Sequence, residues 1–219
     1  MSVVARHVAQ SGSLAEQAYR LFEEQLVTLR LAPGELIGEK DLVNIAGIGR
    51  TPVREAIQRL SAEGLLQVLP RKGLMVTPLR RSDLSQIIEA RRVLERLMVV
   101  KAAERATPDQ RQALKVLAAQ LESTDGNLEF FFRLDHRLDE LLETACHNRF
   151  LVNALTAMHS QCRRLWYLNR QHLDLPRSAR LHGGLARAVA NGDGAGAIRA
   201  LDEIITILET LVLGLDELS

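Results

Sequence analysis

Two short helical segments joined by a glycine-containing turn restrict most strongly what this chain can fold into. Glu39–Ala46 and Pro52–Glu63 have apolar residues at helical spacing, and Gly47-Ile48-Gly49 separates them. Thr51 and Pro52 are typical of the N-cap and the first position of a helix. Two helices joined by a three-residue turn that contains glycine form a helix-turn-helix motif. The expected contacts between these helices come from Leu42, Ala46, Ile48, Val53 and Ile57.

A helix over Leu14–Leu31 is predicted before this motif, and a hairpin after it. Leu66–Leu69 and Leu74–Thr77 are short apolar runs on either side of Pro70–Gly73, which is a turn-forming sequence. The tip of the hairpin carries Arg71 and Lys72. A basic hairpin after a helix-turn-helix motif indicates a wing, so residues 1–78 are expected to form a winged helix-turn-helix domain.

Polar and basic side chains lie at or near the start of Pro52–Glu63, the second helix of the motif, on the side away from its apolar contacts. These residues are Arg50, Thr51, Arg54 and Gln58. The start of a recognition helix meets base edges in the major groove, where Arg binds O6 and N7 of guanine. Lys40 is expected at a phosphate, and the wing-tip residues Arg71, Lys72 and Gly73 at the minor groove. The alternative interpretation is a solvated helix face on a small helical domain.

The balance of charge implies that any DNA-binding surface is confined to one segment of the chain. The chain has 28 Lys and Arg against 27 Asp and Glu, so no general basic excess exists. Residues 38–80, however, contain seven basic side chains and four acidic ones. The basic excess therefore coincides with the predicted motif and wing.

Composition favours a mostly α, globular protein. Apolar residues make up 47% of the chain, charged residues 25% and aromatic residues 4%, which excludes wholesale disorder and low complexity. Met1–Gln10 lacks the apolar core of a signal peptide, and no apolar run is long enough to span a bilayer, so a cytoplasmic location is expected. Cys146 and Cys162 fit no zinc-finger spacing and are expected to be small buried side chains.

The remainder of the chain, residues 82–219, is helical in its periodicity throughout. Thr107-Pro108-Asp109-Gln110 is a capping box that begins one of these helices. Six helices are predicted to form an antiparallel bundle: Ser82–Arg105, Pro108–Glu122, Asn127–Cys146, Arg149–Arg170, Pro176–Ala190 and Asp193–Leu213. These helices are expected to form a second domain.

The segment from Gly47 to Leu65 resembles the winged helix-turn-helix of GntR-family transcription regulators. The helical remainder is similar to the ligand-binding domain of the FadR-like, or FCD, subfamily. The resemblance implies a homodimer that binds a two-fold symmetric DNA operator and responds to a small metabolite held in the bundle. It implies DNA contacts for Lys40, Arg50, Arg54 and the wing tip. Gly49 departs from the family pattern, which often has Ser or Thr there.

Asp135 and Asp139 form a pair of acidic residues in the predicted helix Asn127–Cys146. They lie four residues apart, so both carboxylates point to the same side of a helix and repel each other. Such a pair is either solvated, or it shares a proton, a cation or a basic partner.

The resemblance implies that this pair belongs to a former metal site. The metal-binding positions of the family correspond to Asp135, Asp139, His182 and Ile204, and the family has His at the second and fourth of them. His136 cannot substitute, because it lies about 100° round the helix from Asp135. The three remaining ligands suit Mg²⁺, Mn²⁺ or Ca²⁺ better than a closed zinc site. We therefore expect no tightly bound zinc, with a weakly bound divalent cation at Asp135, Asp139 and His182 if any metal binds.

A small carboxylate or hydroxy-acid effector is expected in the bundle. Arg91 matches a family pattern in which the Arg points into the ligand cavity, and a buried Arg requires an anionic partner. Arg163 or Arg164 would add a second positive group, although each is more often an exposed surface residue. The expected effector-binding residues are Arg91, Asp135, Asp139, Arg163 and His182. In this arrangement Arg91 binds the carboxylate of the effector and the aspartates bind its hydroxyls.

Two other functions compete with a ligand-responsive regulator. The first is a metal-dependent hydrolase or lyase that uses Asp135, Asp139 and His182 and has a basic N-terminal module. The sequence has no His-Glu-x-x-His motif, nucleophile elbow or glycine-rich phosphate loop, so this alternative is not preferred. The second is a constitutive DNA-binding protein whose helical domain only dimerises, which requires a filled bundle interior.

Overall fold

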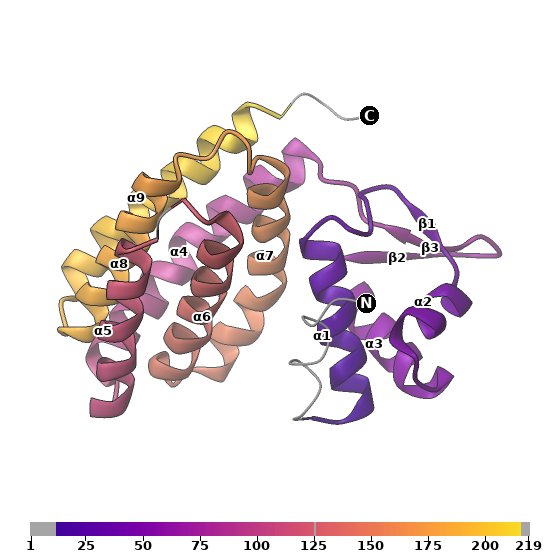
Figure 1. Cartoon of the computed structure of the whole chain (residues 1–219), viewed down its shortest axis with the longest axis horizontal. Helices are drawn as coiled ribbons and strands as arrows, with labels where there is room; N and C mark the ends of the chain where they lie inside the picture. Colours follow the sequence, from indigo (N-terminus) through magenta and orange to yellow (C-terminus); the bar gives the residue numbers. More distant parts are fainter. Residues whose placement is uncertain (1–11, 125, 216–219) are drawn as a thin grey trace. The chain divides into compact units, whose positions relative to one another are not determined.

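The computed structural model describes residues 12–124 and 126–215, which divide into two compact units (Figure 1). The N-terminal unit contains the described residues up to Leu79 together with His159–Leu168. The C-terminal unit contains Arg80–Met158 and the described residues from Asn169 onward. Helices dominate the described residues, which confirms the predicted fold class of a mostly α chain with a helix-turn-helix near its start.

Three helices of the N-terminal unit form the helical part of the predicted winged helix-turn-helix domain. They are α1 (Leu14–Val27), α2 (Glu39–Ala46) and α3 (Arg50–Ala62). The bounds of α2 are as predicted, but α1 ends before Leu31 because Leu29 adopts a left-handed conformation with φ 58°. The predicted N-cap of α3 is wrong, since Gly49 and not Thr51 occupies it. Pro52 is tolerated inside the first turn, where backbone N–H groups have no acceptor within the helix.

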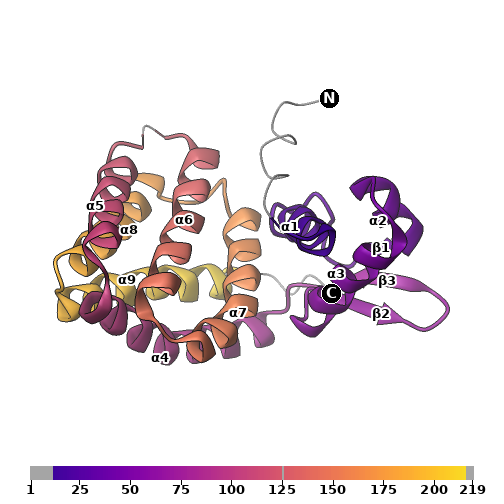
Figure 2. The same ribbon diagram turned by 90° about the horizontal axis from the view of Figure 1, so that it is seen from below.

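A three-stranded antiparallel sheet completes this unit. Its strands are β1 (Leu36–Ile37), β2 (Leu66–Leu69) and β3 (Gly73–Val76), in the order β1-β3-β2. β2 and β3 form the predicted hairpin, in which Leu66 pairs with Val76 and Leu69 with Gly73. The hairpin loop extends outward from the helices of this unit (Figure 2). β1 was not predicted, because two residues are too few to show an alternating pattern.

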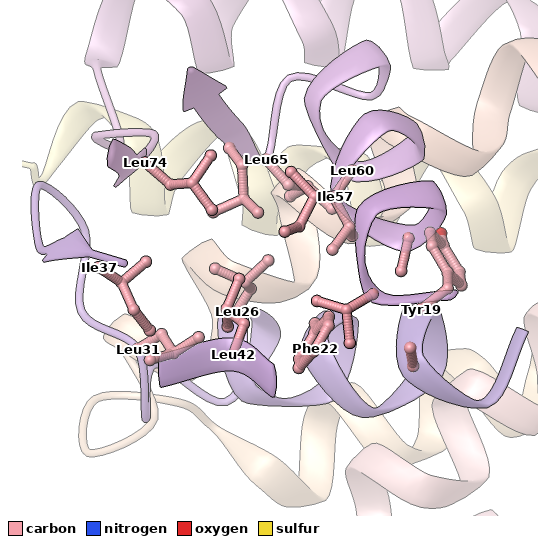
Figure 3. Close-up of a cluster of buried hydrophobic side chains, with 14 of the residues drawn as sticks. Tyr19, Phe22, Leu26, Leu31, Ile37, Leu42, Ile57, Leu60, Leu65 and Leu74 are labelled. Carbon is pink, nitrogen blue, oxygen red and sulfur yellow. The ribbon is translucent and has the colours of Figure 1, made fainter. Parts of the chain in front are cut away.

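The core of the N-terminal unit lies between the three helices and the sheet. Phe22 and Leu26 from α1, Leu42 from α2 and Leu60 from α3 have no solvent-exposed surface (Figure 3). Gly47 takes the left-handed conformation at the end of α2, with φ 65°, which glycine adopts without steric cost. This core fixes α3 against α1 and leaves the opposite face of α3 outside.

The described residues of the C-terminal part form the six predicted helices. They are α4 (Arg81–Arg105), α5 (Pro108–Glu122), α6 (Leu128–Cys146), α7 (Arg149–Leu168), α8 (Leu175–Ala190) and α9 (Gly194–Leu213). Thr107 caps α5 through the predicted capping box, whereas Arg80 rather than Ser82 is at the N-cap of α4. Within the C-terminal unit, α8 packs against both α5 and α9, and α4 packs against α6 and α9.

Two further expectations concern membrane segments and cysteines. Cys146 and Cys162 are both buried, as expected. Among the described helices, none combines the length and apolar character that crossing a bilayer requires.

Candidate functional site

The recognition face predicted on α3 is exposed along its length. Its four members face solvent: Arg50, Thr51, Arg54 and Gln58. The opposite face is buried through Val53, Ala56, Ile57 and Leu60. α3 therefore presents one polar, basic surface while its apolar side holds it in the core. Because helices that enter the major groove need such a free face, this arrangement suits DNA binding.

An ion pair joins α2 to this face. The Nε–H of Arg54 donates a hydrogen bond to Oε1 of Glu39 over 2.7 Å, across the turn of the motif. Glu39 is the first residue of α2, where a carboxylate interacts favourably with the helix dipole. No sequence pattern marks Glu39 as part of the site, although it lies beside Lys40 at the same helix start.

Lys40 and the wing residues Arg71, Lys72 and Gly73 are all exposed. Arg71 has φ 64° and Gly73 has φ 96°, so the wing turns sharply at its tip. A side chain at Gly73 would place its Cβ 3.0 Å from the carbonyl oxygen of Ile37. The basic tip therefore depends on a glycine that lets β3 approach β1 closely.

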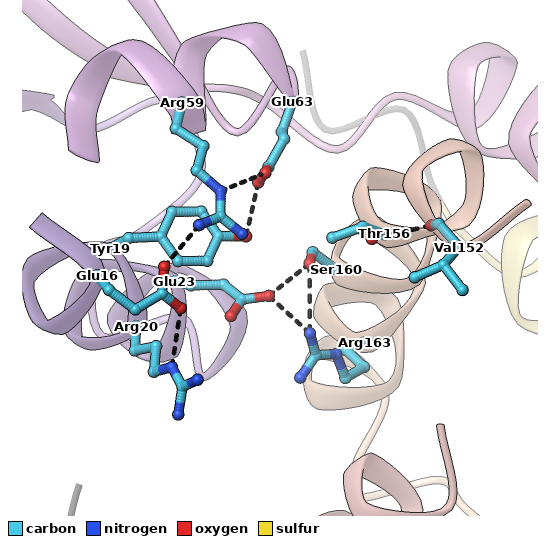
Figure 4. A network of polar contacts seen from close by, with 10 residues as sticks. All are labelled: Glu16, Tyr19, Arg20, Glu23, Arg59, Glu63, Val152, Thr156, Ser160 and Arg163. Atoms are coloured by element: carbon cyan, nitrogen blue, oxygen red, sulfur yellow. Dashed lines mark hydrogen bonds and ion pairs between the residues drawn. The ribbon is translucent and has the colours of Figure 1, made fainter. Parts of the chain in front are cut away.

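A polar network holds α3 against α1 on the side away from the recognition face (Figure 4). Arg59 donates to Glu63, the C-cap residue of its own helix, and to Glu16 on α1, over 3.2 and 2.8 Å. Its guanidinium carbon lies 3.5 Å from the ring centroid of Tyr19, whose hydroxyl donates to Glu63 over 2.8 Å. Burial, with the charges of Glu23 and Glu63, raises the pKa of Tyr19. The sequence alone did not reveal this network, because it joins residues more than forty positions apart.

The part of α7 that belongs to the N-terminal unit contributes a second set of contacts. Ser160 and Arg163 both donate to Oε1 of Glu23, over 2.6 and 2.7 Å (Figure 4). Arg164 donates to the carbonyl oxygen of Thr77 and, over 2.8 Å, to Gln161. The expectation that both arginines are more often exposed is wrong: Arg164 is fully buried and Arg163 is mostly covered. Burial lowers the pKa of the Arg164 guanidinium to about 10.

Asp135 and His182 are brought together inside the C-terminal unit. The Nε2 atom of His182 lies 3.1 Å from Oδ1 of Asp135, and Nδ1 lies 2.7 Å from the carbonyl oxygen of Ser178. Phe131 packs its ring edge-on against the imidazole. Burial opposes the charged form of His182, but the hydrogen bond and charge of Asp135, with Ser178 and Asp139, raise the pKa overall. The geometry therefore favours an imidazolium that donates from both nitrogens.

Asp139, the third predicted member of the metal site, is partly exposed and affects His182 through its charge. Ile204, at the fourth position, is buried and has no donor atom. Within the part of the chain that the structure describes, no three His, Cys, Asp or Glu side chains are arranged to hold a metal ion.

Arg91 is buried, as its predicted inward orientation requires. Its Nε and Nη2 atoms donate to Oε1 of Glu95, one turn further along α4, over 3.2 and 2.7 Å. The two side chains expose only 9% and 3% of their surface. A ligand carboxylate at Arg91 would therefore share or replace an existing anionic partner.

Two family models match successive segments of the chain. Residues 14–76 match the model described as bacterial regulatory proteins, gntR family, and residues 86–206 match the FCD domain. The first match covers the winged helix-turn-helix, and the second covers most of the helical remainder, including Arg91, Asp135 and His182.

Individual relatives of the chain are HTH-type transcriptional regulators, and a solved structure shares its fold. The chain is 32% identical over 145 residues to the uncharacterized HTH-type transcriptional regulator YdhC of Bacillus subtilis, a match that spans 64% of this chain and 63% of that protein. It is 25% identical over 191 residues to the HTH-type transcriptional repressor RspR of Escherichia coli, with 86% and 84% covered. The solved structure of E. coli McbR/YncC has the same fold, with a TM-score of 0.80 at 23% identity over 93% of this chain and 98% of that one.

Proposed function

The chain belongs to the GntR family of bacterial transcriptional regulators, carries an FCD domain and is not an enzyme, and from this premise we propose how it works. It binds a two-fold symmetric DNA operator as a homodimer, and a small organic acid in the C-terminal unit modulates that binding. Residues 1–78 act as the DNA-binding domain and residues 82–219 as the effector-binding and dimerisation domain.

The observation that carries the proposal is the exposed face of α3. Arg50 and Arg54 lie one turn apart on it, and Arg presents the paired donors that guanine O6 and N7 accept. Thr51 and Gln58 extend the same surface. Lys40 at the start of α2 and the wing tip add exposed cations, which suits contacts with the phosphate backbone and the minor groove.

Selection of duplexes from a random library with the full chain tests this DNA-binding activity. The expected result is a recovered site with two related half-sites, bound by two chains, because paired recognition helices read half-sites about one helical turn apart. Recovery of no preferred sequence, under salt conditions where random DNA is also not bound, would contradict the proposal.

The proposed homodimer would use an exposed apolar pair on α4. Val93 and Leu97 lie one turn apart and are 68% and 45% exposed. A second copy of the chain that packs on this face would remove both from water. Analytical sedimentation of the wild type and of Leu97→Asp tests this contact. The wild type is expected to be a dimer and the variant to dimerise more weakly. A monomeric wild type would contradict the proposed dimer.

The proposed effector is an anionic hydroxy acid or sugar acid. Arg91 provides the cation for its carboxylate, and Asp135 and Asp139 provide acceptors for its hydroxyls. His182, held as an imidazolium by Asp135, adds a positive group in the same unit, which offsets the cost of bringing an anion near two carboxylates. Arg163, the second cation expected from the sequence, donates to Glu23 within the N-terminal unit and is therefore not part of this proposed site. The effector changes DNA binding only if it has different affinities for two arrangements of the protein.

A thermal-shift screen of hydroxy acids and sugar acids, followed by calorimetry, tests the effector site. Arg91→Ala is expected to reduce affinity for the best acid about tenfold or more, because a charge-assisted contact is lost. Arg92→Ala is the matched control, since Arg92 lies next to Arg91 but pairs with Glu209 at the surface. Equal affinity in wild type and Arg91→Ala, or a neutral apolar molecule as the tightest ligand, would contradict this chemistry.

A further inference from the structure

The ion pair between Glu39 and Arg54 is exposed to solvent, so the stability of the fold does not account for it. Arg54 exposes 64% of its side-chain surface and Glu39 exposes 38%. Exposed pairs of this kind stabilise a fold little, because water screens them and two side chains lose rotamer freedom. The pair therefore contributes little to holding α2 against α3, which the apolar core already achieves.

A carboxylate at this position also opposes DNA binding in general. Glu39 is next to Lys40, the proposed phosphate contact, and is paired with Arg54, the proposed base contact. A negative charge close to the phosphate backbone reduces affinity for every DNA sequence. Any advantage of Glu39 at a DNA interface must therefore come from its effect on Arg54.

The geometry indicates what that effect is. Glu39 accepts a hydrogen bond from Nε of Arg54 and so fixes the plane and direction of the guanidinium. This bond uses the Nε–H edge of the guanidinium and leaves the end of the group, where Nη1 and Nη2 each have an N–H that points away from the side chain, for another acceptor. These two N–H groups are the paired donors that a guanine edge accepts. An Arg54 without this acceptor would instead be able to turn toward phosphate oxygens, which every sequence offers.

We propose that Glu39 is a positioning residue that orients Arg54 for base reading, so that it increases discrimination between sequences while it lowers affinity for DNA in general. This inference rests on the proposed DNA-binding function. It assigns a role in specificity to a residue that itself touches no base.

Two substitutions of Glu39 separate orientation from charge. Glu39→Ala removes both the acceptor and the charge, whereas Glu39→Gln removes the charge but keeps an acceptor oxygen. Both variants are expected to bind random-sequence DNA about two- to fivefold more tightly, because a charge that repels phosphate is lost. Only Glu39→Ala is expected to lose discrimination between the selected site and single-base variants, by about three- to tenfold. Glu39→Gln is expected to retain most of it.

Two controls use the same helices. Glu55→Ala removes an exposed carboxylate next to Arg54 on α3, and it is expected to raise affinity for random DNA without reducing discrimination. In an Arg54→Ala background, Glu39→Ala is expected to cause no further loss of discrimination, since its effect passes through Arg54. Thermal unfolding of each variant confirms that the fold is retained.

The binding measurements use the full chain with the selected duplex, its single-base variants and a random duplex at several salt concentrations. Equal discrimination in Glu39→Ala and Glu55→Ala would overturn the role of Glu39, as would an undiminished effect of Glu39→Ala without Arg54. A wild-type chain that selects no sequence would overturn the proposed function as well, so the two failures are distinguishable.

Discussion

Asp135 and His182 form a buried hydrogen-bonded pair, with 3.1 Å between Oδ1 and Nε2, in the interior of the C-terminal unit. The second ring nitrogen of His182 is 2.7 Å from the carbonyl oxygen of Ser178, so both nitrogens face acceptors. An imidazole with two acceptors is best satisfied when both nitrogens carry protons. The pair consequently behaves as an internal ion pair, and its energetics depend on pH.

The stability of the fold is expected to depend on His182 in a defined pH range. Its pKa in the folded protein is raised above the ordinary value of 6.5. The stabilisation is therefore fully present below about pH 6.5 and is lost as pH rises through the folded pKa. His182→Gln is expected to cost about 3–5 kcal/mol at pH 6, because the buried Asp135 loses its cationic partner, and less at pH 9. Urea unfolding across this range measures the difference.

His172→Gln is the control for this series, since His172 is exposed. It is expected to change the free energy of unfolding by less than about 0.5 kcal/mol at each pH. A cost of His182→Gln that increases with pH would show that His182 is neutral in the folded protein.

Metal content is a second prediction. The family resemblance places Ile204 at one of four metal-binding positions, where it offers no ligand atom, and Asp135 is already bonded to His182. Elemental analysis after dialysis against a mild chelator is expected to find far less than one zinc per chain. A stoichiometric content would show that other residues bind the metal. Weak Mg²⁺, Mn²⁺ or Ca²⁺ binding at Asp135, Asp139 and His182 is tested by titration of the chelated protein.

The wing provides a third prediction. Gly73 has φ 96° and its missing Cβ would lie 3.0 Å from Ile37 O. Gly73→Ala is expected to cost about 1–3 kcal/mol of stability, since alanine is strained there and the contact is to backbone. Gly184→Ala is the matched control, because no atom lies within 4 Å of its added Cβ. It is expected to be neutral or to stabilise α8 by up to about 1 kcal/mol. Equal effects of the two substitutions would contradict the geometry of the wing.

Single substitutions at the DNA-binding face form the fourth prediction. Arg50→Ala is expected to cost about 1–3 kcal/mol at the selected site and to relax specificity at one base position. Lys40→Ala is expected to weaken all sequences about equally and to reduce the salt slope by about one. Fluorescence anisotropy with cognate and random duplexes at several salt concentrations distinguishes them. Identical behaviour of the two variants would contradict their separate roles.

Local signals in the sequence predicted most of the secondary structure. The bounds of α2 follow from helical spacing before Gly47, and the start of α5 follows from the capping box at Thr107. The N-cap of α3 was wrong because Gly49, which lacks a capping side chain, takes that position through its backbone conformation. β1 was missed because its two residues are defined only by their pairing with β3.

Side-chain partners were harder to predict when they came from distant positions. The Arg91–Glu95 pair lies within one helix turn and its spacing is visible in the sequence, as is the recognition face of α3. In contrast, the burial of Arg164 depends on Thr77, and the position of Arg59 depends on Tyr19. No periodicity within one helix indicates such contacts, because tertiary packing alone creates them.

The central claim is that Arg50 and Arg54 on α3 read the sequence of DNA. The most direct test is titration of the selected duplex and of a random duplex with the full wild-type chain and with the double variant Arg50→Ala/Arg54→Ala. The account predicts that the double variant still unfolds at nearly the wild-type temperature, because both side chains are exposed, and binds the two duplexes with nearly equal affinity. Full sequence-selective binding by the double variant would contradict it.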